Sequence, residues 1–570
     1  MKYYSNIKKI LSKNEILLFS FISVGLVITS IVELFGISMV IPIVYTLTTD
    51  SFYFEIIKFL EIYNIDNLSK NQIIKISLIL FALIFLIKNI LLGIFYWFEG
   101  KFIYSVSEKI SSKIFKKFLN KDFSYHLKEN SADMMSKINI ELNYIKSFFV
   151  SLLNFISEII IFFGLIVVLL FLSSEVLFKV LPLFILFFSL FYLFFNKIIK
   201  RIGEERKKND YLKTKKIQES IGGIREIITF EKENYFSDIY DKYINKLIKV
   251  FYRYHFLTKL PRIYFETLAI IGIASFSILV LFSSSNTEVF IATLTIFVAI
   301  SLRLLPSINR IINSINNFKY CFPAFISIGK ELSAKKNRVK KKNDIKTFSS
   351  LELKNIFFKF PKSNYNISVN LKIKSGDKIG VLGESGSGKT TLINILLGLY
   401  NPIRGDVLLN NLKKTNTDFR SLISYVPQSV YIFDDTIIEN ITLGDYDETN
   451  DKKKLNESLK YSCSEIFINK LQKKILSNTG ESGSKLSQGQ KQRIGIARAL
   501  YKESAILILD EITSSLDNKN SSEIIKQILK IKDKTIIFST HKPELLKNFD
   551  KVLRIKKGKI FIEKKIKILT

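Results

Sequence analysis

Six long apolar runs fill the first 330 residues, and they restrict the fold more than any other feature of the sequence. Each is close to the roughly 20 residues that an α-helix needs to cross the hydrocarbon core of a bilayer. Continuous stretches such as Ile159–Leu172 and Val180–Phe195 disfavour the alternative, a set of buried helices in a large soluble core. We therefore predict six membrane-spanning helices, over residues 16–46, 74–98, 147–172, 176–196, 260–282 and 289–312.

The basic residues between these runs predict the orientation. Lysine and arginine crowd the segment before the first run and the loops between runs two and three and between runs four and five. The loop after the first run holds little beyond Lys58 and Lys70. By the positive-inside rule, the amino terminus, both long loops and everything after the sixth run are cytoplasmic. The first run is too long for a cleavable signal peptide, and no small-residue cleavage site follows it.

The composition indicates whether the chain interacts with nucleic acid or with a membrane. The chain has 84 Lys and Arg against 51 Asp and Glu, a balance that by itself would suit a nucleic-acid-binding protein. The excess is spread over the cytoplasmic loops, the linker and the carboxy-terminal part, as in a membrane protein that faces an anionic leaflet. We therefore expect a membrane-lipid environment and no nucleic acid. Two cysteines and three histidines predict neither a disulfide framework nor a histidine metal cluster.

A charged linker separates two kinds of sequence. Lys335–Asn343 is a solvated charge run, and Leu351–Phe360 after it alternates apolar and polar residues as a first strand should. The predicted organisation is a transmembrane domain over residues 1–330, a linker over 331–348, and an α/β domain over 349–570 that carries the motifs described next.

Residues 383–390 read Gly-Glu-Ser-Gly-Ser-Gly-Lys-Thr, the G-x-x-x-x-G-K-[ST] pattern of a phosphate-binding loop. Its glycines let backbone N–H groups curl around phosphate oxygens, Lys389 can reach the terminal phosphates, and the Thr390 hydroxyl can coordinate Mg²⁺. A buried strand over Lys378–Leu382 and a helix over Thr391–Leu397 fit this context better than an ordinary Gly/Ser turn. The predicted ligands are ATP and Mg²⁺, with nucleotide contacts from Gly383, Ser385, Gly386, Gly388, Lys389, Thr390 and Thr391.

Two adjacent carboxylates follow a second apolar strand, Ala505–Leu509. Asp510 can hold Mg²⁺ directly or through water, while Glu511 orients or deprotonates the attacking water. His541 follows another strand and can contact the γ-phosphate; taken alone, it would more simply be a loop residue. These residue types predict ATP hydrolysis.

Two further segments resemble motifs of the ATP-binding cassette (ABC) family, and specifically of its exporters. Tyr425-Val-Pro-Gln428 is similar to the Q-loop, and Leu486-Ser-Gln-Gly-Gln490 to the signature motif, with a helix expected just after it. The resemblance implies that Ser487, Gly489 and Gln490 contact ATP held by a second copy of the domain. Gln488 stands where the family usually has its first glycine, so we expect function with somewhat altered geometry.

The same resemblance implies further roles by position. Gln428 is the Q-loop glutamine, which is expected to bind the metal ion and take part in catalysis. Asp517 belongs to the D-loop, and His541 is the switch histidine. Phe360 occupies the place of an aromatic residue that stacks on adenine. Residues 125–135 and 222–232 fall where exporters place short helices against the ATPase, although either could be an ordinary loop.

The resemblance also implies the assembly. Six spans and one ATPase make half a transporter, because the signature motif of one copy completes the phosphate loop of another. Both motif sets are present, so a homodimer formed through the transmembrane and ATPase domains is the economical arrangement. The expected activity is ATP hydrolysis coupled to transport.

Polar residues recur along the sixth run at intervals of four, three, four and three, which places them on one helical stripe. They are Arg303, Ser307, Arg310, Ser314 and Asn317. Intramembrane arginines usually face a cavity or a partner. Arg303 and Arg310 therefore either bind an anionic substrate head, such as a diphosphate, or pair with carboxylates such as Glu33, Glu158 or Glu266 to hold helices together.

A narrower resemblance concerns the cargo. Pro261–Glu266, Leu302–Ile312 and the aromatic stretch Phe52–Tyr63 are similar to the bacterial Pgl-type flippases for lipid-linked oligosaccharides in protein N-glycosylation. It implies that ATP drives a polyprenyl-diphosphate-linked oligosaccharide from the cytoplasmic to the outer leaflet of the bacterial inner membrane. Two alternatives stay open. One is an exporter of other lipids, peptides or drugs; the other is a regulatory protein that binds ATP without hydrolysing it, which would have little use for Glu511 and His541.

Overall fold

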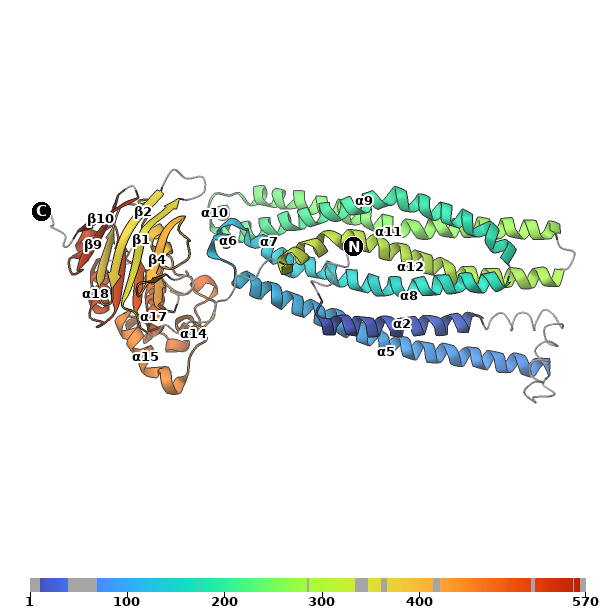
Figure 1. Ribbon diagram of the computed structural model, residues 1–570, viewed down its shortest axis with the longest axis horizontal. Helices are drawn as coiled ribbons and strands as arrows, with labels where there is room; N and C mark the ends of the chain where they lie inside the picture. Colours follow the sequence, from blue (N-terminus) through green and yellow to red (C-terminus); the bar gives the residue numbers. More distant parts are fainter. Residues whose placement is uncertain are drawn as a thin grey trace. The chain divides into compact units, whose positions relative to one another are not determined.

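The computed structural model divides the chain into two compact units (Figure 1). Unit 1 comprises Met1–Lys121 and Lys128–Asn337, and unit 2 comprises Asp122–Leu127 and Arg338–Thr570. The structure describes residues 11–38, 69–172, 174–283, 287–333, 347–359, 366–413, 421–513, 518–556 and 558–563. The stretch Phe52–Tyr63, together with Phe360 and Asp517, lies outside these residues.

Long helices build unit 1. They are α2 (Lys13–Ser38), α5 (Lys70–Leu119), α8 (Leu142–Leu172), α9 (Ser174–Gly222), α11 (Glu233–Ser283) and α12 (Thr287–Ser333). Each contains a predicted apolar run, although the first run continues past α2 into residues outside the described part. Among the described residues, three stretches are long and apolar enough to cross a membrane: Lys13–Gly36, Asn71–Leu119 and Ser131–Val168.

Several helices are much longer than a membrane span. The 50 residues of α5 extend about 75 Å, more than twice the ~30 Å hydrocarbon core. Large apolar side chains on its membrane part point outward, including Ile79 (65% exposed) and Trp97 (64% exposed). Such a surface needs lipid or another protein to cover it.

Aromatic packing and close backbone contact hold these helices side by side. Helix α8 packs against both α2 and α12, while α9 packs against α11 and α12. The rings of Phe148 on α8 and Phe325 on α12 pack at a tilt of 32°, with centroids 4.6 Å apart. At Gly203 of α9, a Cβ atom would lie 2.6 Å from the carbonyl oxygen of Tyr320. Glycine is therefore required for α9 to approach α12 this closely.

Short helices occur in both segments where we expected them. They are α6 (Phe123–Lys128), α7 (Ser131–Ser136) and α10 (Ile224–Thr229), and a π-helical turn, η1 (Lys137–Glu141), follows α7. Residues Asp122–Leu127 group with unit 2, where the Phe123 ring centroid lies 6.2 Å from that of Tyr400.

Unit 2 is built around one ten-stranded sheet with the order β5-β4-β1-β2-β10-β9-β3-β8-β7-β6. Its strands are β1 (Ser350–Lys359), β2 (Asn366–Lys374), β3 (Lys378–Leu382), β4 (Arg404–Leu409), β5 (Leu412–Lys413), β6 (Ile423–Val426), β7 (Ile506–Asp510), β8 (Thr535–Thr540), β9 (Lys551–Lys556) and β10 (Lys559–Glu563). Strands β3, β8, β7 and β6 pair in parallel, whereas β1 pairs antiparallel with β2 and β4. The predicted strand over 351–360 and the strands before the phosphate loop, Asp510 and His541 are confirmed within two residues.

Helices pack against this sheet through aliphatic side chains. They are α13 (Lys389–Leu396), α17 (Gln488–Tyr501) and α18 (Asn518–Leu529). Helices α14 (Ile437–Thr442), α15 (Glu448–Tyr461) and α16 (Glu465–Ile468) pack on α17 instead, and short 3₁₀ turns are η3 (Lys474–Leu476), η4 (Glu481–Gly483) and η5 (Pro543–Leu546). Every residue of β7 and β8 is buried, as expected for central parallel strands with both faces covered.

The contact at Gly203 makes a testable prediction for the fold. Gly203→Ala should destabilise the purified protein by about 1–3 kcal/mol, because backbone atoms of Tyr320 have to move. Gly100→Ala in α5 is the matched control: nothing lies within 4 Å of its Cβ position, and alanine favours a helix. Thermal unfolding in detergent measures both. A Gly203→Ala protein as stable as Gly100→Ala would contradict the contact.

Candidate active site

Four parallel strands bring the chemical groups of unit 2 to one edge of the sheet. The phosphate loop follows β3, and His541 follows β8. Asp510 is the last residue of β7 with Glu511 directly after it, and Gln428 lies two residues beyond β6. Because β3, β8, β7 and β6 are neighbours in the parallel part of the sheet, their carboxyl ends meet. Ligands of open α/β sheets bind at this edge.

The phosphate loop has the backbone that its glycines permit. Gly386 and Gly388 have φ angles of +79° and +111°, in the region that favours glycine. Gly388 is also the N-cap of α13, and a Cβ atom there would lie 2.9 Å from Ile367. The loop therefore ends at a helix N-terminus, where free backbone N–H groups and the helix dipole favour an anion.

Lys389 lies at the centre of a small ionic network. Its side chain is 6% exposed, and its Nζ is 2.9 Å from Glu511 Oε1. The same Nζ donates to the carbonyl oxygens of Gly383 (2.7 Å) and Glu384 (3.1 Å). The ammonium is thus held over the loop, where it can contact a terminal phosphate.

Asp510 is almost fully buried and receives two hydroxyl donors. Ser539 Oγ donates to its Oδ1 at 2.5 Å, and Thr390 Oγ1 donates to its Oδ2 at 3.4 Å. Burial raises the pKa of Asp510, and the nearby Glu511 charge raises it further, while both hydrogen bonds oppose the shift. A carboxylate and a hydroxyl oxygen this close together form a hard oxygen donor set of the kind that Mg²⁺ prefers.

Glu511 is fixed in an unusual backbone conformation. Its φ angle is +47°, which is uncommon for a residue other than glycine, and its N–H donates to the carbonyl oxygen of Ser539 at 3.1 Å. Its side chain accepts from Gln428 Nε2 at 3.0 Å and pairs with Lys389. Backbone strain of this kind often occurs at functional sites, where it holds a side chain in place.

The structure brings together Lys389, Thr390, Asp510, Glu511 and Gln428, while His541 is exposed just beyond β8 at the same edge. The buried Ser387 Oγ has no hydrogen-bond partner among the described residues, a donor suited to a phosphate oxygen. These groups fit a nucleoside triphosphate with a hard divalent cation. Sequence reasoning missed Ser539. Its position two residues before His541, on a strand that pairs with β7, is the signal that could have identified it.

The signature segment forms a regular helix start. Ser487 is the N-cap of α17, and a capping box joins it to Gln490, with N–O distances of 3.3 and 2.9 Å. Gln488 is the first helical residue, a position that needs no glycine. Ser487 and Gln488 are exposed, so a partner surface can approach the N-terminus of α17.

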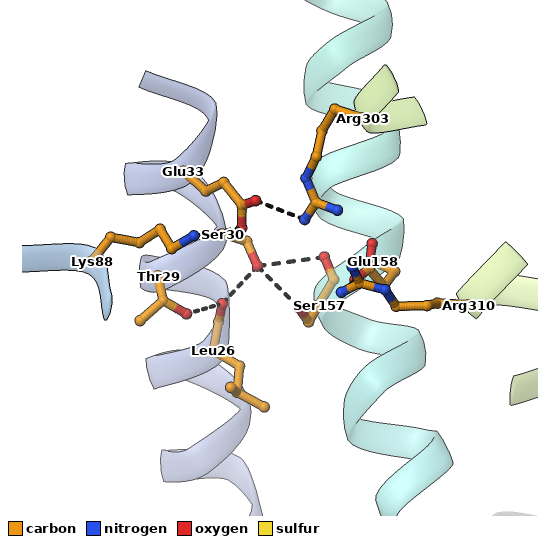
Figure 2. Close-up of polar contacts among 9 residues, drawn as sticks. All are labelled: Leu26, Thr29, Ser30, Glu33, Lys88, Ser157, Glu158, Arg303 and Arg310. Atoms are coloured by element: carbon orange, nitrogen blue, oxygen red, sulfur yellow. Dashed lines mark hydrogen bonds and ion pairs between the residues drawn. The ribbon is translucent and has the colours of Figure 1, made fainter. Parts of the chain in front are cut away.

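The polar stripe on α12 packs against other helices of unit 1 (Figure 2). Arg303 Nη2 is 2.7 Å from Glu33 Oε1 of α2, and Arg310 Nη1 is 2.5 Å from Glu158 Oε1 of α8. Both partners are among the carboxylates that the sequence suggested for structural pairing. Ser307 and Ser314 are buried, and Asn317 donates to Ser151 Oγ at 2.6 Å. The ion pairs are present, and the Arg310 side chain is still 53% exposed.

Comparisons with known proteins agree with this architecture. The family model described as ABC transporter matches residues 367–514, and the one described as ABC transporter transmembrane region matches residues 16–308. An export ATP-binding/permease protein of Rickettsia typhi is 30% identical over 493 residues, which cover 83% of this chain and 84% of that protein. An ATP-dependent lipid A-core flippase of Francisella tularensis is 36% identical over 220 residues, 38% of this chain and 36% of the relative. A solved structure, a bacterial Atm1-family ABC exporter with ATP bound, has the same fold, with a TM-score of 0.79 at 17% identity over 96% of this chain and 94% of that one.

The contacts of Glu511 predict the effect of its amide analogue. Glu511→Gln should lower ATP turnover by at least about 100-fold, because the carboxylate that orients water is lost. ATP should still bind and bring two ATPase units together. Phosphate release and nucleotide binding measure the two effects separately. Retained turnover in this variant would refute the assigned role of Glu511.

The raised pKa of Asp510 predicts a trade-off between stability and function. Since burial disfavours the charged carboxylate, the ionised form at neutral pH destabilises the fold relative to a neutral side chain. Asp510→Asn should therefore raise the unfolding midpoint of nucleotide-free protein by about 2–4 °C, the shift that roughly 1 kcal/mol gives in a unit of this size, while hydrolysis is lost.

The control is Ser539→Ala, which removes a donor to Asp510 and should lower the same midpoint. A lower midpoint in Asp510→Asn would show that the carboxylate charge is compensated in the fold.

Proposed function

The chain belongs to the ABC transporter family, with an exporter-type fold that couples ATP hydrolysis to transport, and we propose that its cargo is a polyprenyl-diphosphate-linked oligosaccharide. ATP drives the head group from the cytoplasmic to the outer leaflet of a bacterial inner membrane. The amino terminus and the ATPase unit lie in the cytoplasm.

One observation carries the choice of cargo. Arg303 and Arg310 lie on one stripe of α12, two helical turns or about 10.5 Å apart. The Arg310 guanidinium pairs with Glu158 yet leaves more than half of its side chain exposed. Arginine presents several N–H donors in a fixed fork, which suits the oxygens of a diphosphate. The lipid A-core flippase that matches over 36% of its length supports a lipid as the class of cargo.

The proposed ATPase cycle uses the groups at the strand ends. Lys389 and the loop N–H groups bind the β- and γ-phosphates, and Thr390, Asp510 and Gln428 would hold Mg²⁺, which would offset charge on the phosphates. Glu511 orients the attacking water, and His541 contacts the γ-phosphate. Ser487, Gly489 and Gln490 complete the site from a second copy, and the resemblance assigns Asp517 to the D-loop and Phe360 to stacking on adenine. The active form is therefore a homodimer with two sites.

ATPase stimulation separates this proposal from an exporter of other lipids, peptides or drugs. A polyprenyl-diphosphate oligosaccharide should stimulate the reconstituted protein, whereas cationic and neutral amphiphiles of similar chain length should not. Stimulation by the amphiphiles alone would favour the drug or peptide exporter.

The two arginines supply the mutational test. Arg303→Ala and Arg310→Ala should each reduce stimulation by the lipid-linked oligosaccharide at least about tenfold, as expected for losing a charge-assisted hydrogen bond. Arg201→Ala is the matched control, since it breaks an exposed Arg–Glu pair of 3.1 Å on α9 that contributes little.

Loss of the folded dimer in the α12 variants, seen by size-exclusion chromatography and thermal unfolding, would show that the arginines act only in structure. Equal stimulation of all three variants would refute the proposed head-group site.

A further inference from the structure

Glu33 of α2 lies between cations from two other helices. Arg303 Nη2 of α12 is 2.7 Å from its Oε1, and Lys88 Nζ of α5 is 3.8 Å from its Oε2. All three side chains are nearly buried, with exposed fractions of 13% for Glu33, 17% for Arg303 and 11% for Lys88. Figure 2 shows Glu33 projecting from α2 between the two, with its contact to Arg303 drawn. One carboxylate thus serves two cations.

The two contacts differ in strength. The Arg303 distance is that of a charge-assisted hydrogen bond, while 3.8 Å is beyond hydrogen-bonding range. The Lys88 ammonium also lies 5.1 Å from the Phe85 ring centroid, close enough for a cation–π contact. Lys88 is therefore near Glu33 but loosely held, whereas Arg303 holds Glu33 tightly.

The pair of Glu158 and Arg310 is arranged differently. Glu158 is 4% exposed, and its Oε2 has no hydrogen-bond partner among the described residues. Arg310 is the cation that neutralises Glu158 in this part of the structure, with one guanidinium nitrogen at 2.5 Å and the side chain half exposed. Arg310 can therefore contact a ligand with its other N–H groups while its ion pair with Glu158 stays intact.

Arg303 has no such freedom. Its side chain is largely buried, and turning its guanidinium to an anionic ligand would separate it from Glu33. A carboxylate left unpaired in a low-dielectric interior is strongly unfavourable. When Arg303 turns away from Glu33 toward a ligand, Glu33 needs another cation, and the Lys88 ammonium, 3.8 Å from Glu33 Oε2, is placed to supply it.

We propose that Lys88 is a positioning residue. Its ammonium pairs with the Glu33 carboxylate when an anionic head group binds the Arg303 guanidinium. In the exchange, the Glu33–Arg303 ion pair is replaced by a Glu33–Lys88 pair and a phosphate–Arg303 pair, so no buried charge is left uncompensated. This inference rests on the proposed function, because it assigns the step that frees Arg303 for the diphosphate. Since α2, α5 and α12 each contribute one member, binding of the head group changes how these helices are joined.

The test is a double-mutant cycle on ligand binding. Full-length protein in lipid nanodiscs, free of nucleotide, is titrated with a polyprenyl diphosphate that carries no sugar. Lys88→Met should weaken binding about tenfold, because Glu33 then has no second partner. Glu33→Gln should tighten it, since Arg303 is released. Combining Lys88→Met with Glu33→Gln should restore affinity to at least that of the wild type, and Lys88→Arg should keep it.

Matched controls separate this role from folding. Lys101→Met removes another lysine of α5 and should bind like the wild type; thermal unfolding and size-exclusion chromatography verify the fold of every variant. If Lys88→Met weakens binding equally in the wild-type and in the Glu33→Gln background, Lys88 contacts the ligand directly and the exchange is refuted. Unchanged binding by Lys88→Met also refutes it. If the wild type binds no polyprenyl diphosphate, the proposed function itself is refuted. If the wild type binds it but the cycle shows no coupling between Lys88 and Glu33, only the proposed exchange is refuted.

Discussion

In both the ATPase site of unit 2 and the helix bundle of unit 1, a buried charge has to be compensated by an opposite charge. In unit 2, Lys389 pairs with Glu511 at 2.9 Å above the phosphate loop, and in unit 1 Arg303 pairs with Glu33 at 2.7 Å inside a bundle of apolar helices. In each case a cation suited to phosphate is held by a carboxylate of the protein itself. In the proposed function, a phosphate that enters either site competes with that carboxylate, so its binding is linked to a rearrangement of side chains on other elements.

The two units meet this requirement with different architectures. The parallel strands of unit 2 place four loop ends at one edge, so that residues far apart in sequence converge on one nucleotide. The strained backbone of Glu511 and the hydroxyl of Ser539 then fix the carboxylates with little freedom. In unit 1, charged groups lie on separate helices that are joined mainly by apolar contacts. The proposed exchange of ion pairs between those helices therefore leaves the surrounding apolar packing in place.

The sequence predicted helices, strands and motifs better than it predicted the contacts between distant segments. The phosphate loop, the strand ending in Asp510 and the six apolar runs follow from local patterns, because spacing alone fixes strands, helices and the loop between them. The periodicity of Arg303 and Arg310 predicted one stripe on α12 but not which helices face it, since that depends on packing between distant segments. Glu33 and Glu158 were named as possible partners, together with Glu266, because intramembrane arginines usually face a cavity or a partner. Lys88 escaped notice because a single lysine in an apolar run carries no pattern, and the length of α5 beyond the membrane has no local signal either.

Translocation by purified protein in liposomes tests the central claim most directly. The cargo is a labelled polyprenyl-diphosphate oligosaccharide, and Glu511→Gln is the control without hydrolysis. Our account predicts ATP-dependent movement of the label across the bilayer in the wild type and none in the variant. ATP hydrolysis without movement of this lipid, in liposomes whose protein is folded and active, would contradict the proposed cargo while leaving the exporter fold and its ATPase in place.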